Sequence, residues 1–152
     1  MEPTEIKKLA SEANGETWKY LTKDILGEDE KVQMLSCAYA SLYLWARSGG
    51  TAINLARGHW LISRVCCVIE SPTLAQHHSK LCQTYTDLAE DKKDFDFVYA
   101  FESEARVAAL LQNNKKAIEL KAKAKKLASE IKDAQDREIV EGDLNSGPWF
   151  GL

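Results

Sequence analysis

The sequence predicts an all-α fold of antiparallel helix hairpins stacked side by side, with about six to seven helices. Apolar residues recur at steps of three and four, and no segment alternates with the period of two that is typical of a strand. A hairpin pattern also occurs twice, at about Leu55–Leu88 and Phe97–Ile131. At an offset of 42 residues the copies align small residues where helices are expected to pass closely: Ser63 with Ala105, Cys66 with Ala108, Ala75 with Ala117 and Cys82 with Ala124.

The N-terminal third of the chain predicts two helices. Pro3 suits the first turn of a helix, because its missing N–H would have no partner there. The apolar stripe that follows continues through Gly15, so we predict one helix at about Thr4–Ile25, with a break at Gly15 as the alternative. Gly27 is a typical C-cap residue. A second helix is predicted at about Asp29–Arg47, ended by a serine and two glycines.

The later helices have recognisable start and stop signals. Thr51 is a good N-cap residue, and Ser71-Pro72 combines an N-cap with proline at the first helical position. Asn113-Asn114 separates the last two long helices. The predicted bounds are about Thr51–Ile69, Pro72–Ala89, Phe95–Leu111 and Lys115–Lys132, with a charged connector at Glu90–Asp94 and, as an open alternative, a short seventh helix at Asp133–Leu144.

The length of 152 residues favours one domain with a core of its own. We predict a single helical domain over residues 1–144 and a C-terminal tail over residues 145–152. Trp149 and Phe150 are unusual in such a tail, since large aromatic side chains are seldom left exposed. They are expected to dock on the chain's own groove or on a second subunit, with a frayed tail as the alternative.

Composition excludes several classes of partner. The net charge of −3 gives no overall attraction to nucleic acid or to an anionic membrane. No apolar run approaches the roughly 20 residues of a membrane span, and the N-terminus lacks the layout of a signal peptide. We therefore expect a cytoplasmic protein whose four cysteines are reduced. No glycine-rich phosphate loop or other cofactor motif is present, so no cofactor is expected.

The two hairpins resemble tetratricopeptide (TPR) repeats. The residues that match the pattern are Ile62, Ser63, Cys66, Ala75, Ser79 and Cys82 in the first copy, and Ala105, Ala108, Ala117 and Ala124 in the second. The resemblance implies a right-handed α-α superhelix in which the first helix of each hairpin lines a concave groove. The chain departs from the pattern in its offset, which is longer than the usual ~34 residues, and in lacking the glycine-aspartate turn.

A second resemblance covers the middle of the chain. The runs Tyr43–Gly50 and Asn54–Val65 are similar to a family of uncharacterised prokaryotic TPR-like proteins. This similarity implies the same type of fold and no particular activity.

The TPR register implies a candidate groove. It brings together Arg57, Trp60 and Arg64 of the third helix with Tyr99, Glu102 and Arg106 of the fifth, and places Arg47 and Asn54 at the border, on the preceding loop. Two arginines beside a tryptophan suit a carboxylate or phosphate next to an apolar or aromatic group. The alternative is an internal network in which Arg57 or Arg64 pairs with Glu102 and Trp60 lies in the core.

Histidine and cysteine residues give weaker signals. His78 and Cys82 are four residues apart, a spacing that zinc sites use. Cys82 falls at a packing position, however, which favours the alternative that Cys82 is a buried thiol and that the histidines lie on the surface above it. Of the vicinal Cys66 and Cys67, one is expected in the core and the other facing the groove or partly exposed. A nucleophilic role would require a positioned base nearby, with Arg64 as a group that lowers a thiol pKa.

These observations favour a non-enzymatic interaction module whose groove binds a peptide segment or a small anion. The alternatives are a small-molecule sensor, or an enzyme of unknown reaction, that uses the same arginine and tryptophan face, and a structural homodimer. An enzyme needs a thiol or histidine beside a base in a closed pocket, whereas a peptide binder needs an open trough.

Overall fold

The computed structural model describes the whole chain, Met1–Leu152, and contains seven helices and no strand. The helices are α1 (Pro3–Leu21), α2 (Glu28–Arg47), α3 (Ala52–Val68), α4 (Pro72–Leu88), α5 (Asp94–Leu110), α6 (Asn114–Ser129) and α7 (Ala134–Asn145). The all-α prediction is confirmed. The first helix ends at Leu21, four residues before the predicted Ile25, because the chain already turns at Thr22 toward α2.

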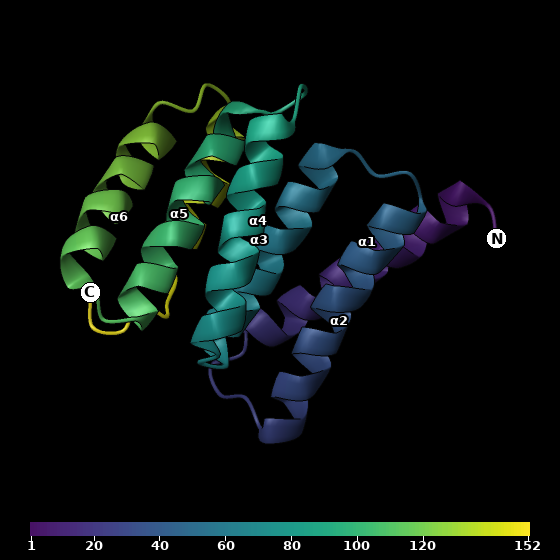
Figure 1. The fold of residues 1–152 in the computed structure, drawn as a ribbon, viewed down its shortest axis with the longest axis horizontal. Coiled ribbons are helices and arrows are strands. Elements are labelled where there is room, and N and C mark those ends of the chain that lie inside the picture. The colour runs from purple at the N-terminus through teal and green to yellow at the C-terminus, as the bar shows by residue number, and fades with distance from the viewer.

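The helices pack as sequential antiparallel hairpins, in which α1 pairs with α2, α3 with α4 and α5 with α6. Figure 1 shows α1 and α2 at one end of the molecule, tilted against the other helices, with the C-terminus at the opposite end. The last helix, α7, packs on α5 and α6. No helix is both long enough and apolar enough to cross a membrane.

The small residues that the repeat aligns lie at the helix contacts. Ala75 and Ala117 are fully buried, and the other aligned small residues are at most 4% exposed. Ser63 also uses its hydroxyl, which donates to the carbonyl of Ala75 over 3.0 Å and so joins α3 to the start of α4. The absence of large side chains at these positions lets the two helices of each hairpin approach closely.

The turns inside the two repeated hairpins have the same geometry. Glu70 and Gln112 are 112 − 70 = 42 residues apart, and both are left-handed, with φ of 55° and 60°. The residue after each of them donates its N–H across the turn, from Ser71 to Cys66 O over 2.8 Å and from Asn113 to Ala108 O over 2.9 Å. The repeat therefore extends to the backbone of the turn, although neither turn contains glycine.

Candidate functional site

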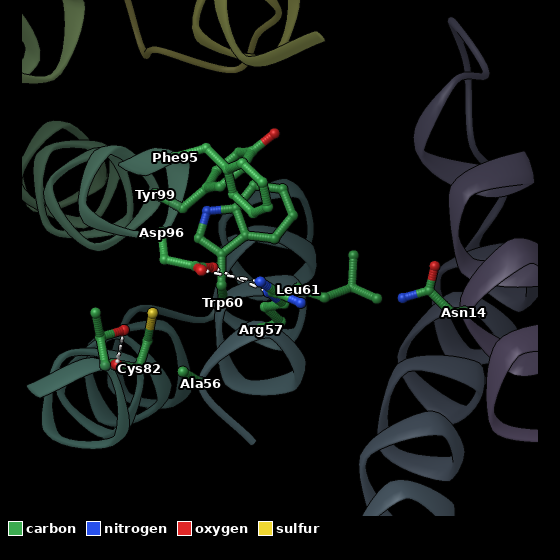
Figure 2. A pocket seen from close by; sticks show the side chains of 10 residues that line it. Asn14, Ala56, Arg57, Trp60, Leu61, Cys82, Phe95, Asp96 and Tyr99 are labelled. Atoms are coloured by element: carbon green, nitrogen blue, oxygen red, sulfur yellow. Dashed lines mark hydrogen bonds and ion pairs between the residues drawn. The ribbon is translucent and has the colours of Figure 1, made fainter. Parts of the chain in front are cut away.

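A cavity of about 170 Å³ is lined by residues of α1, α3, α4 and α5, which include the first helices of the three hairpins (Figure 2). Aromatic side chains form much of its wall. The ring centroids of Trp60 and Tyr99 are 4.6 Å apart, and Phe95 lies 6.4 Å beyond Tyr99. The complete lining is Asn14, Ala56, Arg57, Trp60, Leu61, Cys82, Thr86, Phe95, Asp96 and Tyr99.

An ion pair lies beside the aromatic wall. Arg57 on α3 donates from Nε and Nη2 to the two carboxylate oxygens of Asp96 on α5, both over 2.9 Å. Asp96 is buried and also accepts the N–H of Lys93, so it caps α5 as well. The hydrogen bonds that Arg57 donates to Asp96 raise the pKa of Arg57, with smaller contributions from the charges of Asp96 and Asp91. Arg57 is about half exposed and keeps free N–H donors toward solvent.

A second, more polar pocket of about 330 Å³ adjoins the cavity. Asn14 and Arg57 line both pockets, so the two pockets are neighbours, and we call them together the trough. Figure 2 shows Asn14 reaching across from α1 toward the α3 side chains. At Gly58, a Cβ atom would lie 2.8 Å from a methyl group of Leu42, so glycine permits α2 and α3 to approach here. The polar pocket is lined by Ser11, Asn14, Ser41, Trp45, Asn54, Arg57 and Gly58.

Next to the trough lies a buried charged cluster around Glu102. Trp60 Nε1 and Arg106 Nε each donate to the Glu102 carboxylate over 2.5 Å. Arg64 Nη1 lies 3.8 Å from the same carboxylate. All four side chains are at most 7% exposed. The carboxylate thus joins two arginines and the cavity wall.

The C-terminal residues cover this cluster. Arg106 donates to the carbonyls of Asp143, Ser146 and Pro148 over 2.9–3.1 Å. Arg64 makes longer contacts, of 3.3 Å to Asp143 O and 3.4 Å to Gly147 O. Tyr99 donates to the Asp143 carboxylate over 2.6 Å. The predicted groove is therefore open at Arg57 and closed by the chain itself at Arg64 and Arg106.

The residues predicted for the groove thus divide into three groups. Asn54, Arg57, Trp60 and Tyr99 line the trough, while Arg64, Glu102 and Arg106 form the buried cluster. Arg47 is exposed and lines neither pocket. Arg47 and Asn54 also lie in helices rather than on the loop between them, at the end of α2 and in the first turn of α3.

The sequence prediction lacked several site residues, of which three make or offer polar contacts that the site depends on. Asn14 lies beside the apolar stripe of α1, and a polar residue there is a signal that could have identified it. Asp96 has no local signal for its ion pair, because its partner Arg57 is 39 residues away. Asp143 carries no local signal, because its role depends entirely on where α7 packs.

The histidines form a pair with each other. His78 Nδ1 lies 2.9 Å from His59 Nδ1, and its Nε2 lies 2.6 Å from the Tyr39 hydroxyl. Burial lowers the pKa of both histidines to about 4. Cys82 instead packs against Trp60, and no three potential metal ligands gather anywhere in the chain. The structure therefore does not join His78 and Cys82 in a metal site, and His78 is buried rather than on the surface.

The vicinal cysteines differ from the prediction. Both Cys66 and Cys67 are fully buried, so the expectation that one of them faces the groove or is partly exposed is wrong. The reason is that α3 packs against α2, α4 and α5 and has no open face at these positions. Burial raises the pKa of Cys66 to about 11 and that of Cys67 to about 12, in Cys67 despite the nearby positive charges of Arg106 and Arg64.

Comparisons with protein-family models, with curated proteins and with solved structures find no match, so no family is identified for the chain.

Proposed function

We propose that the chain is a non-enzymatic interaction module with a TPR-like, right-handed stack of hairpins, and that its trough binds an extended peptide segment of a partner protein. The observation that carries this proposal is that the two neighbouring pockets share Asn14 and Arg57 in their walls. The aromatic cavity suits a bulky apolar side chain of a peptide, and the neighbouring polar pocket suits the peptide main chain next to that side chain. In this arrangement the side chain contacts Trp60 and Tyr99, and the peptide backbone runs along Asn14, Asn54 and Arg57.

The polar groups of the trough suit a peptide backbone. A carboxamide such as that of Asn14 offers both a donor and an acceptor, which matches the N–H and C=O of one peptide unit. Its side chain has no hydrogen-bond partner in the protein, so it is free to pair with a ligand. Arg57 adds donors for a further carbonyl.

Charge favours a neutral peptide over the small anion that the sequence left open. The guanidinium of Arg57 is already paired with Asp96, and Asp91 contributes a second negative charge nearby. An incoming anion would meet two carboxylates around one arginine. These carboxylates would repel an anion, but they do not repel an uncharged peptide main chain.

The cavity chemistry supports binding more than catalysis. Its one thiol, Cys82, has a pKa raised to about 12 by burial and so remains protonated at neutral pH. Its one carboxylate, Asp96, is held by Arg57 and by the helix start. The histidine pair belongs to α3 and α4 and does not line the cavity. The cavity therefore contains no nucleophile beside a base.

The test is selection from a displayed library of random peptides on the whole chain, followed by affinity measurement for the enriched sequences. Enriched peptides should share a bulky apolar residue. Asn14→Ala should weaken their binding about 2- to 10-fold, the effect of losing one or two hydrogen bonds. This variant keeps the fold, because alanine favours helix and no internal hydrogen bond is lost.

The matched control is Gln33→Ala, which removes a carboxamide from the exposed face of α2. It should bind the selected peptides with unchanged affinity. The proposal is wrong if no peptide is enriched, or if Asn14→Ala and Gln33→Ala bind the selected peptides equally well.

A further inference from the structure

The C-terminal residues Ser146–Leu152, which we call the tail segment, make contacts typical of a bound peptide. Trp149 is 7% exposed, and its indole N–H donates to Leu144 O over 2.9 Å. The ring lies next to two cations, with the guanidinium carbon of Arg106 and the Nζ of Lys121 each 4.1 Å from its centroid. One buried aromatic side chain thus anchors the segment through cation–π contacts.

Apart from a hydrogen bond from the Ser146 hydroxyl to Gly142 O, the remaining polar contacts of the tail segment are made by its main chain. Arg106 Nη1 donates to Ser146 O over 2.9 Å and to Pro148 O over 3.0 Å. Arg64 reaches Gly147 O at 3.4 Å, and Lys121 reaches Leu152 O at 3.2 Å. Such polar contacts recognise a bent backbone with one tryptophan, and Phe150 adds apolar contacts with two core clusters. Another peptide with this backbone and this anchor would make the same contacts.

The tail segment leaves the hydrogen bonding of the buried arginines incomplete. Two buried guanidiniums, Arg64 and Arg106, share the carboxylate of Glu102, and their other acceptors are uncharged carbonyls. Arg64 Nε is buried and has no acceptor at all. Asp143 adds a second negative charge near Arg64, but its carboxylate is hydrogen-bonded to Tyr99 rather than to either guanidinium. A ligand that places an acidic group near Arg64 would therefore complement the site better than the tail segment does.

We propose that the face beneath the tail segment is a second binding site, that it takes an acidic, tryptophan-bearing peptide segment of a partner protein, and that the chain's own tail segment is its resident ligand. The partner displaces the tail segment, places its indole between Arg106 and Lys121, and pairs its acidic group with Arg64. This proposal does not rest on the trough described above, because the two sites have different walls and different charge.

Tethering sets the strength of the competition. A ligand on a short tether acts at a local concentration of the order of millimolar. A separate peptide must displace the tethered tail segment before it can bind. The apparent affinity of the separate peptide is therefore reduced by a factor of about the local concentration of the tail segment divided by the dissociation constant of the tail segment. Loosening the tail segment should therefore raise the affinity for a separate peptide.

The experiment uses two fluorescein-labelled, C-terminally amidated peptides and the full-length chain. The first has the sequence Ser-Gly-Pro-Trp-Phe-Gly-Leu, and the second has aspartate in place of its first glycine. Binding is measured by fluorescence anisotropy to the wild type, Trp149→Ala and the trough variant Asn14→Ala. Trp149→Ala should bind the first peptide at least 10-fold more tightly than the wild type does, the second peptide should bind more tightly than the first, and Asn14→Ala should match the wild type.

Circular dichroism of Trp149→Ala shows whether the helices remain. If they do, equal binding by Trp149→Ala and the wild type, absence of binding to both, or no preference for the aspartate peptide overturns the proposal. If the helices of Trp149→Ala are lost, Trp149→Phe is used instead, since this variant keeps an aromatic ring in place and loses the indole N–H that donates to Leu144 O. Trp149→Phe should then bind both peptides more tightly than the wild type, and unchanged binding overturns the proposal. If the trough does not bind peptides, these expected results stay the same, so failure of the first proposal can be distinguished from failure of this one.

Discussion

Trp60 and Glu102 occupy equivalent positions of the two repeated hairpins and are hydrogen-bonded to each other, with 2.5 Å between Trp60 Nε1 and Glu102 Oε2. Their separation of 102 − 60 = 42 residues equals the repeat offset. Arg64 and Arg106 are related in the same way, and both lie beside the Glu102 carboxylate. The repeat therefore aligns its groove-side residues into one buried polar cluster, which links α3 to α5.

Glu102→Gln should strongly destabilise the protein. The substitution keeps the size of the side chain and removes the negative charge that Arg64 and Arg106 share. Breaking a buried ion pair by removing one partner typically costs about 3–5 kcal/mol, because an uncompensated charge remains. Urea denaturation monitored by circular dichroism gives the free energy of unfolding.

The control for this prediction is Glu104→Gln, two residues away on the same helix. Glu104 is partly exposed and pairs with Lys116, which is about half exposed. Its loss should change the free energy of unfolding by less than about 1 kcal/mol, as for other surface ion pairs. Equal effects of the two substitutions would show that Glu102 does not hold the cluster together.

Much of the architecture follows from local sequence signals. The recurrence of small residues such as Ala75 and Ala117 predicted which helix faces pack, because only small side chains allow close approach of two helices. Ser71-Pro72 placed the start of α4 correctly, since proline at the first helical position is a strong signal. The end of α1 was predicted less well, because the apolar residues Ile25 and Leu26 continue the stripe beyond the helix.

The site was predictable only in part. The register placed Arg57, Trp60 and Tyr99 on one face, which is where the cavity lies. That face has two different ends: Arg57 lines the trough, whose binding role stays a prediction, and Arg64 belongs to an internal network with Glu102. What divides them is the path of the tail segment, whose main-chain carbonyls carry no sequence signal.

Glu70→Gly should stabilise the protein by about 0.5–1 kcal/mol. Glu70 has φ of 55°, a left-handed conformation that strains a residue with a Cβ atom and that glycine adopts freely. The side chain is exposed and no interaction is lost. The melting temperature should rise by about 1–4 °C, and Gln112→Gly, at the equivalent turn, should act similarly.

A glycine in a right-handed helix provides the opposite control. Gln33→Gly, on the exposed face of α2, should lower the free energy of unfolding by about 1 kcal/mol. If Glu70→Gly destabilises the protein as Gln33→Gly does, the turn does not require a left-handed residue.

Three of the four thiols should resist alkylation in the native protein. Cys66, Cys67 and Cys82 are buried, with pKa values raised to about 11, about 12 and about 12, so the reactive thiolate is scarce at pH 8. Cys37 is partly exposed and should react first with iodoacetamide. Mass spectrometry should find one modified site per native chain and four per denatured chain. Rapid alkylation of Cys67 would revive a nucleophilic role for it.

Acidification should destabilise the fold through the histidine pair. Burial lowers the pKa of His59 and His78 from 6.5 to about 4, so between these values the unfolded chain binds more protons than the folded chain. The free energy of unfolding should therefore fall as the pH drops from about 6.5 toward 4, and this contribution is fully present above pH 6.5. His78→Gln should reduce the slope of stability against pH in this window, and His77→Gln, at the exposed neighbouring position, should reduce it less, because His77 contributes only a nearby charge to the lowered pKa of the pair. Denaturant unfolding at a series of pH values gives both slopes, and equal slopes for the wild type and His78→Gln would contradict the assignment of this pH dependence to the buried pair.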